Sequence, residues 1–138
     1  ACPCPGPVAA GAKLTGPNDN LGTAAAWVKE RPGTFDMVVH GDAKAFWYNR
    51  DGNWLKLSHR SVATFMKKNG WRRNQPVRLI ACSTGVDADG AAKNLANKLG
   101  TKVSAPTDTV WLHPSGKLSI GPTEFDNGPW RVLTPGKP

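Results

Sequence analysis

Short apolar runs that stop at turn-forming residues recur along this chain. The two clearest cover residues 35–39, directly before His40, and residues 77–81, directly before Cys82. Runs this short and this apolar are typical of buried strands in a parallel sheet. The segment 102–105 has the same character. All three are predicted strands.

Three other segments repeat apolar residues every three or four positions, which is the spacing of a helix with one buried side. Each also carries start or stop signals. They run from the Asn18-Asp19-Asn20 capping region towards Pro32-Gly33, from Ser58 to Gly70, and from about residue 87 to 99 before Gly100.

Pairs of short strands around turn-rich loops predict two hairpins. The first joins 45–48 to 54–57, the second joins 110–112 to 117–120, and 130–133 is a predicted edge strand. Helices that alternate with apolar strands indicate an α/β fold. We expect a single three-layer α/β domain with a mostly parallel central sheet of about five or six strands, helices on both faces and appended β-hairpins.

The first part of the chain differs in composition from the rest. Residues 1–18 are rich in Pro, Gly and Ala, which predicts a flexible lead-in that includes Cys2 and Cys4. Residues 19–138 are then expected to form a single catalytic domain. Because the sequence starts with Ala rather than Met, we expect a piece of a longer polypeptide.

The net charge of +8 favours anionic partners. The densest basic cluster, residues 67–73, follows a predicted helix and is interpreted as a solvated helix end. Nucleic acid stays an alternative partner, although no nucleic-acid-binding motif accompanies the charge. No apolar stretch approaches the ~20 residues of a membrane helix, so no transmembrane segment is expected. Three cysteines form no disulfide framework.

His40 and Cys82 are the candidate catalytic residues. If the two apolar strands before them are parallel neighbours, these side chains lie at adjacent carboxyl ends, where α/β sheets place their chemistry. An imidazole beside a thiol is the minimum equipment for nucleophilic catalysis. The N–H groups of Gly41 and Cys82 are the candidate oxyanion donors. Taken singly, His40 also fits a capped core histidine and Cys82 an inert buried thiol.

Two segments carry a family resemblance. Met37-Val38-Val39-His40-Gly41 and Arg78-Leu79-Ile80-Ala81-Cys82 resemble the strand ends of the caspase-hemoglobinase class of cysteine peptidases. The resemblance implies that His40 is the general acid/base, that Cys82 is the nucleophile, and that Gly41 and Cys82 donate to the oxyanion.

Residues 85–111, with 91–96 and 103–107 inside them, are similar to C-terminal modules of bacterial polymorphic toxins of the Rhs type. This similarity implies a secreted effector that belongs to a larger delivery polypeptide, with a separate immunity protein. It also implies a protein substrate in the target-cell cytoplasm, a reducing compartment that suits the unpaired Cys82.

Several other side chains have both a functional and a structural interpretation. Ser83 and Thr84 either bind substrate or cap the following helix, and Asp108 either selects a basic substrate residue or shapes a turn. His113 is the rival partner for Cys82, although its Pro-Ser-Gly neighbours suggest a hairpin tip.

Asp42 is a candidate to orient His40, or else a solvated loop residue. The three histidines are scattered and the carboxylates lack ligand spacing, so neither a metal nor another cofactor is expected.

The function these features predict is a cysteine-dependent hydrolase, a peptidase toxin that works through a thioester intermediate. One alternative is a glutamine deamidase or acyltransferase with the same His40–Cys82 pair. Another is a non-catalytic basic module that binds nucleic acid or a membrane surface.

Overall fold

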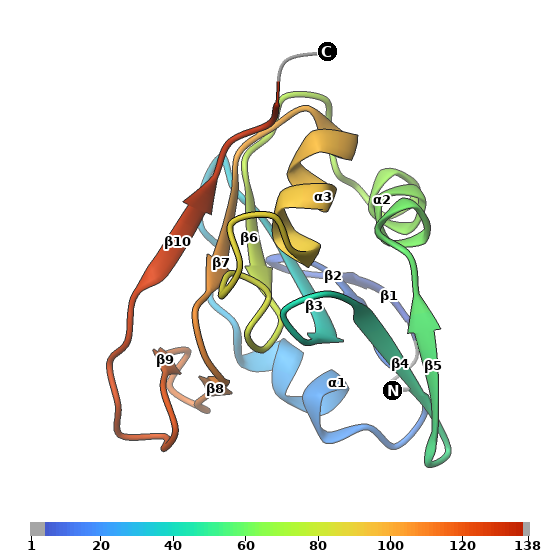
Figure 1. The fold of residues 1–138 in the computed structure, drawn as a ribbon. Helices are drawn as coiled ribbons and strands as arrows, with labels where there is room; N and C mark the ends of the chain where they lie inside the picture. The colour runs from blue at the N-terminus through green and yellow to red at the C-terminus, as the bar shows by residue number, and fades with distance from the viewer. Residues whose placement is uncertain (1–4, 137–138) are drawn as a thin grey trace.

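The computed structural model describes residues 5–136, and its centre is a mixed sheet (Figure 1). Within these residues eight strands form one sheet, in the order β1-β2-β3-β6-β7-β10, with β4 paired to β3 and β5 to β4. These strands are β1 (Gly6–Val8), β2 (Gly11–Leu14), β3 (Phe35–Gly41), β4 (Phe46–Arg50), β5 (Asn53–Leu57), β6 (Val77–Ile80), β7 (Val103–Pro106) and β10 (Trp130–Leu133). A separate hairpin pairs β8 (Val110–Leu112) with β9 (Leu118–Ile120).

The helices are α1 (Asn20–Ala24), which continues as the 3-10 turn η1 (Ala25–Trp27), α2 (His59–Lys68) and α3 (Ala91–Leu99). The α/β class predicted from the sequence is confirmed. None of the helices in residues 5–136 has the length and apolar character to cross a membrane.

The centre of the sheet is parallel and its edges are antiparallel. Strands β2, β3, β6 and β7 pair in parallel, whereas β1 and β10 run antiparallel to their neighbours. The sheet has more strands than the sequence predicted, because β1 and β2 enter it from the predicted lead-in and because β3 continues through His40 and Gly41 and pairs there with β4. That pairing joins the β4–β5 hairpin to the sheet.

Side chains of a strand alternate between the two faces of a sheet. On one face Met37, Val39 and Leu79 pack in a cluster with α2 and α3. On the other face Val38 and Ile80 pack against residues from the α1–η1 segment and from the β8–β9 hairpin. Each face of the parallel centre therefore has its own apolar cluster.

The prediction of a flexible lead-in is wrong for the part that the structure describes. Strand β2 pairs in parallel with β3, and Ala12 is 0% exposed. A Cβ on Gly11 would lie 2.1 Å from the backbone oxygen of Asp36. The small residues that imitate a linker in composition are needed here because β2 packs tightly into the sheet. Cys2 and Cys4 lie outside the described residues.

Candidate active site

His40 and Cys82 lie at the ends of neighbouring parallel strands and on the same face. Val38 pairs with Ile80, so His40 and Cys82 follow two positions later on β3 and after β6. Cys82 packs with the cluster that holds Val38 and Ile80, and the alternation of side chains places His40 on that face too. Both residues line a cavity of about 290 Å³ between the sheet, α1 and β8.

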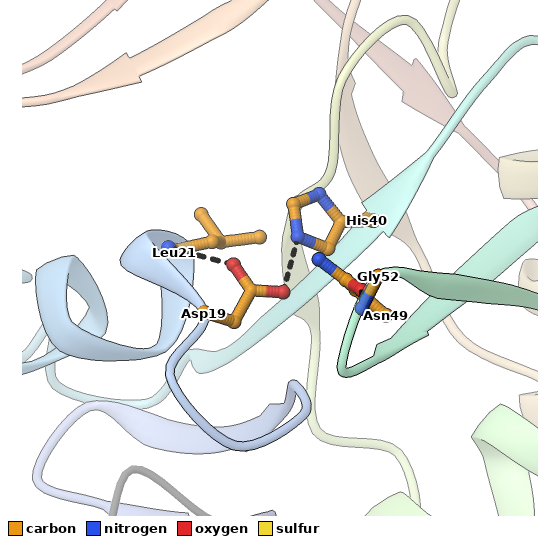
Figure 2. Close-up of polar contacts among 5 residues, drawn as sticks. All are labelled: Asp19, Leu21, His40, Asn49 and Gly52. Carbon is orange, nitrogen blue, oxygen red and sulfur yellow. Dashed lines mark hydrogen bonds and ion pairs between the residues drawn. The ribbon is translucent and has the colours of Figure 1, made fainter.

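His40 is held by a carboxylate from the start of α1 (Figure 2). Asp19 accepts a hydrogen bond from Nε2 of His40 at 2.6 Å, and its other oxygen accepts one from the Leu21 N–H at 3.0 Å. Asp19 is almost fully buried, with 5% of its side chain exposed, against 26% for His40. In the sequence Asp19 is recognisable only as a helix cap, because nothing local indicates that one of its oxygens reaches β3.

The Cys82 thiol points along the cavity towards β8. Its Sγ makes a long contact of 4.0 Å with the backbone oxygen of Val110. Within the described residues the thiol makes no hydrogen bond to His40.

The turn after Cys82 is strained and anchored. Ser83 has a φ of +57°, a conformation that costs a non-glycine residue of the order of 1 kcal/mol and that occurs preferentially at functional sites. Its N–H donates to the backbone oxygen of Asp108 at 3.0 Å, and the Gly85 N–H donates to that of Pro106 at 2.8 Å. These bonds fix the point where the chain leaves β6.

The N–H of Gly41 points towards this same place. Along β3 the Phe35 N–H donates to Pro76 on the β6 side, whereas the Asp42 N–H donates to Ala45 on the β4 side. Because backbone groups alternate in direction along a strand, Gly41 points its N–H in the same direction as Phe35. The predicted oxyanion donor is therefore aimed at the end of β6.

Thr84 requires a correction. Its side chain is completely buried, its hydroxyl donates to the Ala81 oxygen at 2.9 Å, and its methyl group would lie 2.6 Å from a Cβ placed on Gly41. Thr84 thus supports the turn from inside, and it is not among the residues that line the Cys82 cavity. Asp108 accepts from its own neighbour, the Thr109 N–H, at 2.7 Å, which matches the turn interpretation.

The two other candidates for a partner role make different contacts. Nε2 of His113 bonds to the Ser119 hydroxyl at 2.8 Å within the β8–β9 hairpin, and His113 is not among the residues around the Cys82 cavity. Asp42 does not hold His40. It accepts from the N–H groups of Lys44 and Ala45 and from Nε1 of Trp47, each at 2.8 Å.

A second cavity adjoins His40 on the hairpin side. It measures about 410 Å³ and is lined by His40, Gly41, Asp42, Trp47 and Trp54. The Trp54 ring meets the His40 ring edge to face, with centroids 4.9 Å apart and planes at 81°. Neither tryptophan is recognisable as a site residue from the sequence, because two indoles on a predicted hairpin give no sign of what they face.

The end of that hairpin lies beside the His40–Asp19 pair. Asn49, drawn beside the pair in Figure 2, closes the turn by accepting a hydrogen bond from the Gly52 N–H at 2.8 Å. The backbone oxygen of Asn49 lies so close to Gly16 that a Cβ there would be only 1.7 Å away. The hairpin and the loop before α1 therefore pack together around the imidazole.

Comparison with known proteins identifies the family but no activity. A family model described as Domain of unknown function (DUF8616) matches residues 10–120, and the chain belongs to this family. No curated protein and no solved structure matches the chain. Within residues 5–136 the structure holds no group of three or more His, Cys, Asp or Glu side chains placed to bind a metal ion.

Proposed function

We propose that this domain is a cysteine-dependent hydrolase of the peptidase type, with Cys82 as nucleophile, His40 as general acid/base and Asp19 as the residue that orients His40. The observation that carries the proposal is the shared cavity. Two side chains that are distant in sequence leave neighbouring strand ends on one face and line the same space. Chemistry of this kind needs a nucleophile and a base within reach of one substrate atom.

Asp19 strengthens the proposal because it occupies only one ring nitrogen. With Nε2 of His40 bound to the carboxylate, Nδ1 is the nitrogen that exchanges protons with the thiol and the substrate. The negative charge of Asp19 also stabilises the imidazolium that forms when His40 takes a proton. A buried carboxylate thus gives His40 both a fixed orientation and a charge partner.

The reaction then has two halves. His40 takes the Cys82 proton, and the thiolate attacks the substrate carbonyl carbon while the N–H groups of Gly41 and Cys82 donate to its oxygen. The C–N bond breaks, His40 protonates the leaving amine, and a thioester remains on Cys82. Water that loses a proton to His40 then attacks the thioester and regenerates the thiol.

The protein substrate, the delivery polypeptide and the immunity protein belong to the same proposal. They rest on the resemblance of residues 85–111 to toxin modules. A peptidase released into a target cell suits that arrangement, since a reducing cytoplasm keeps Cys82 as a thiol.

The test is to incubate the purified protein with a proteome-derived peptide mixture and to identify new N-termini by mass spectrometry. We expect new termini with the native protein and none with Cys82→Ala or His40→Ala. A mass gain of about 1 Da at glutamine without new termini would instead identify a deamidase.

The binding alternative makes the opposite prediction. If the domain acts by charge alone, reversal of Lys67, Lys68, Arg72 and Arg73 abolishes its effect, while Cys82→Ala leaves the effect intact. That result would contradict the catalytic proposal.

A further inference from the structure

The hairpin β4–β5 presents two tryptophans on the side of the sheet where His40 lies. Trp47 pairs directly with His40 in the β3–β4 ladder, and Trp54 contacts the His40 ring. Trp54 is 52% exposed although it lines a cavity. Exposed aromatic surface inside a concave site is typical of a place that a ligand covers. We call the space bounded by these two residues, His40, Gly41 and Asp42 the tryptophan cleft.

The cleft is already formed before any ligand binds. One carboxylate oxygen of Asp42 accepts the N–H of the Trp47 indole, while the other accepts two backbone N–H groups of the turn. These bonds fix the plane of Trp47, and the edge-to-face contact with His40 limits the movement of Trp54. Rigid aromatic walls bind with little loss of conformational entropy.

The charges around the cleft favour an uncharged ligand. Asp42 is the acidic residue among those that line it, and three hydrogen bonds already engage its oxygens. Lys56 pairs with Trp47 across the hairpin and is close enough to attract the Asp42 carboxylate. The charge of Asp42 is therefore partly compensated and attracts a basic substrate side chain less strongly. The surface that is left to a ligand is mainly indole, which suits a large apolar or aromatic side chain.

The position of the cleft indicates which half of a substrate it holds. His40 lines both this cleft and the cavity of Cys82, so the imidazole lies between the two spaces. During catalysis the acyl half of the substrate is attached to Cys82, and His40 delivers its proton to the amine half. Residues on the side of His40 away from Cys82, which include the tryptophan cleft, therefore face the amine half of the substrate.

We propose that the tryptophan cleft is a specificity site for the residue on the amine side of the cleaved bond, and that it selects a large apolar or aromatic side chain there. This inference rests on the proposed function and adds its substrate preference. By microscopic reversibility, the same cleft also binds an incoming amine that attacks the thioester. In that step the amine nitrogen bonds to the thioester carbon, the C–S bond breaks, His40 takes the amine proton and passes it to the departing Cys82 thiolate.

The experiment uses p-nitrophenyl acetate to acetylate Cys82 and then offers phenylalaninamide, glycinamide or argininamide as acceptors. The N-acetylated products are quantified by mass spectrometry, and each variant is judged by its own ratio of phenylalaninamide to glycinamide product. We expect a ratio of about tenfold or more in the native protein, which is the lower end for burial of one apolar side chain. Argininamide should rank below phenylalaninamide.

Trp54→Ala should reduce this ratio to about twofold or less, and Trp54→Phe should restore most of it. Leu55→Ala is the matched control. Leu55 is the next residue on the same strand, it is 46% exposed, and its side chain points to the opposite face of the hairpin. That variant should keep the native ratio.

The two proposals fail in different ways. If no acetyl thioester forms on Cys82, the proposed function is wrong. If the thioester forms but all acceptors react alike, or if Trp54→Ala leaves the ratio unchanged, the dyad stands and the specificity site is wrong. A preference for argininamide would also overturn the inference, because it would assign the cleft to a cation.

Discussion

Strand β3 carries two ion pairs on the same face, one near each end, and they differ in what they leave free. Near its start, Asp36 receives two hydrogen bonds from Arg78, at 2.9 and 2.6 Å. At its end, His40 makes a single contact of 2.6 Å with Asp19. Asp36 is 0% exposed. His40, by contrast, borders two cavities.

The Asp36–Arg78 pair at the start of the strand leaves no carboxylate oxygen without a hydrogen-bond partner. Both oxygens of Asp36 are engaged in a fork that also fixes the guanidinium of Arg78. Burial raises the pKa of the Asp36 carboxyl, and the hydrogen bonds and charge of Arg78, with the charge of Arg31, offset only part of that rise. The pair therefore holds β3 and β6 in register.

The His40–Asp19 pair at the end of the strand leaves hydrogen-bonding groups of the imidazole free. One nitrogen of the imidazole is free of Asp19, and the ring faces open space on two sides. Thr15 follows the Leu14–Val39 pair and so lies beside His40 in register, and its buried hydroxyl has no partner in the described part of the chain. A buried polar group without a hydrogen-bond partner is uncommon in folded proteins. The two pairs therefore differ in hydrogen-bonding capacity. The structural pair Asp36–Arg78 has both carboxylate oxygens engaged, whereas the pair at the candidate site leaves one imidazole nitrogen free of Asp19.

The largest expected effect is on stability, and it concerns the Asp36–Arg78 pair at the start of β3. Arg78→Met leaves a buried carboxylate without its partner, and we expect it to lower the free energy of unfolding by about 3–5 kcal/mol. Urea denaturation followed by tryptophan fluorescence measures this loss. The double variant Asp36→Leu with Arg78→Met should recover much of the stability, since it removes the orphaned charge. If Arg78→Met alone were neutral, the supporting role of the pair would be disproved.

A smaller effect, on the reactivity of Cys82, is expected for the Asp19–His40 pair at the end of β3. Asp19→Asn keeps an acceptor for the Leu21 N–H, so we expect the free energy of unfolding to change by less than about 1 kcal/mol. Loss of the charge beside His40 should nevertheless slow the alkylation of Cys82 by iodoacetamide about tenfold, which corresponds to ~1.4 kcal/mol. Peptide mapping of the label at pH 6–7 gives the rate at Cys82.

Asp89→Asn is the matched control for this experiment, because Asp89 is an exposed residue outside both His40 cavities. It should alkylate at the native rate. An Asp19→Asn variant that also alkylates at the native rate would show that Asp19 is a helix cap and nothing more.

The smallest expected effect is a dependence on pH at the tryptophan cleft. Burial raises the pKa of Asp42, but the hydrogen bonds from Lys44, Trp47 and Ala45, with the charge of Lys56, bring it below its ordinary value of 3.8. A carboxyl group with a lowered pKa stabilises the fold above its ordinary pKa and loses this contribution as the pH falls through the lowered one. Native protein should therefore be slightly more stable than Asp42→Asn at pH 7, and the difference should shrink at an acidic pH well below the ordinary value of 3.8. Urea midpoints at both pH values measure it, and a constant difference would contradict the assignment.

The amino-acid sequence by itself determined the main elements and one decisive relation between them. The apolar runs 35–39 and 77–81 predicted two parallel neighbours, and the structure pairs β3 with β6 in parallel. Because side chains alternate along a strand, that pairing is enough to bring His40 and Cys82 to one face and one end. The α/β class and both hairpins follow from the same local patterns.

Only the tertiary structure decided what surrounds the imidazole. Asp19 reaches His40 from the start of α1, and Trp54 reaches it from a hairpin that the sequence left detached from the sheet. The Gly- and Ala-rich strand β2 entered the sheet although its composition predicted a linker. The physical reason is common to all three. Local periodicity reports which side of an element is buried, whereas the partner of a side chain depends on how distant elements pack, and no short segment carries that information.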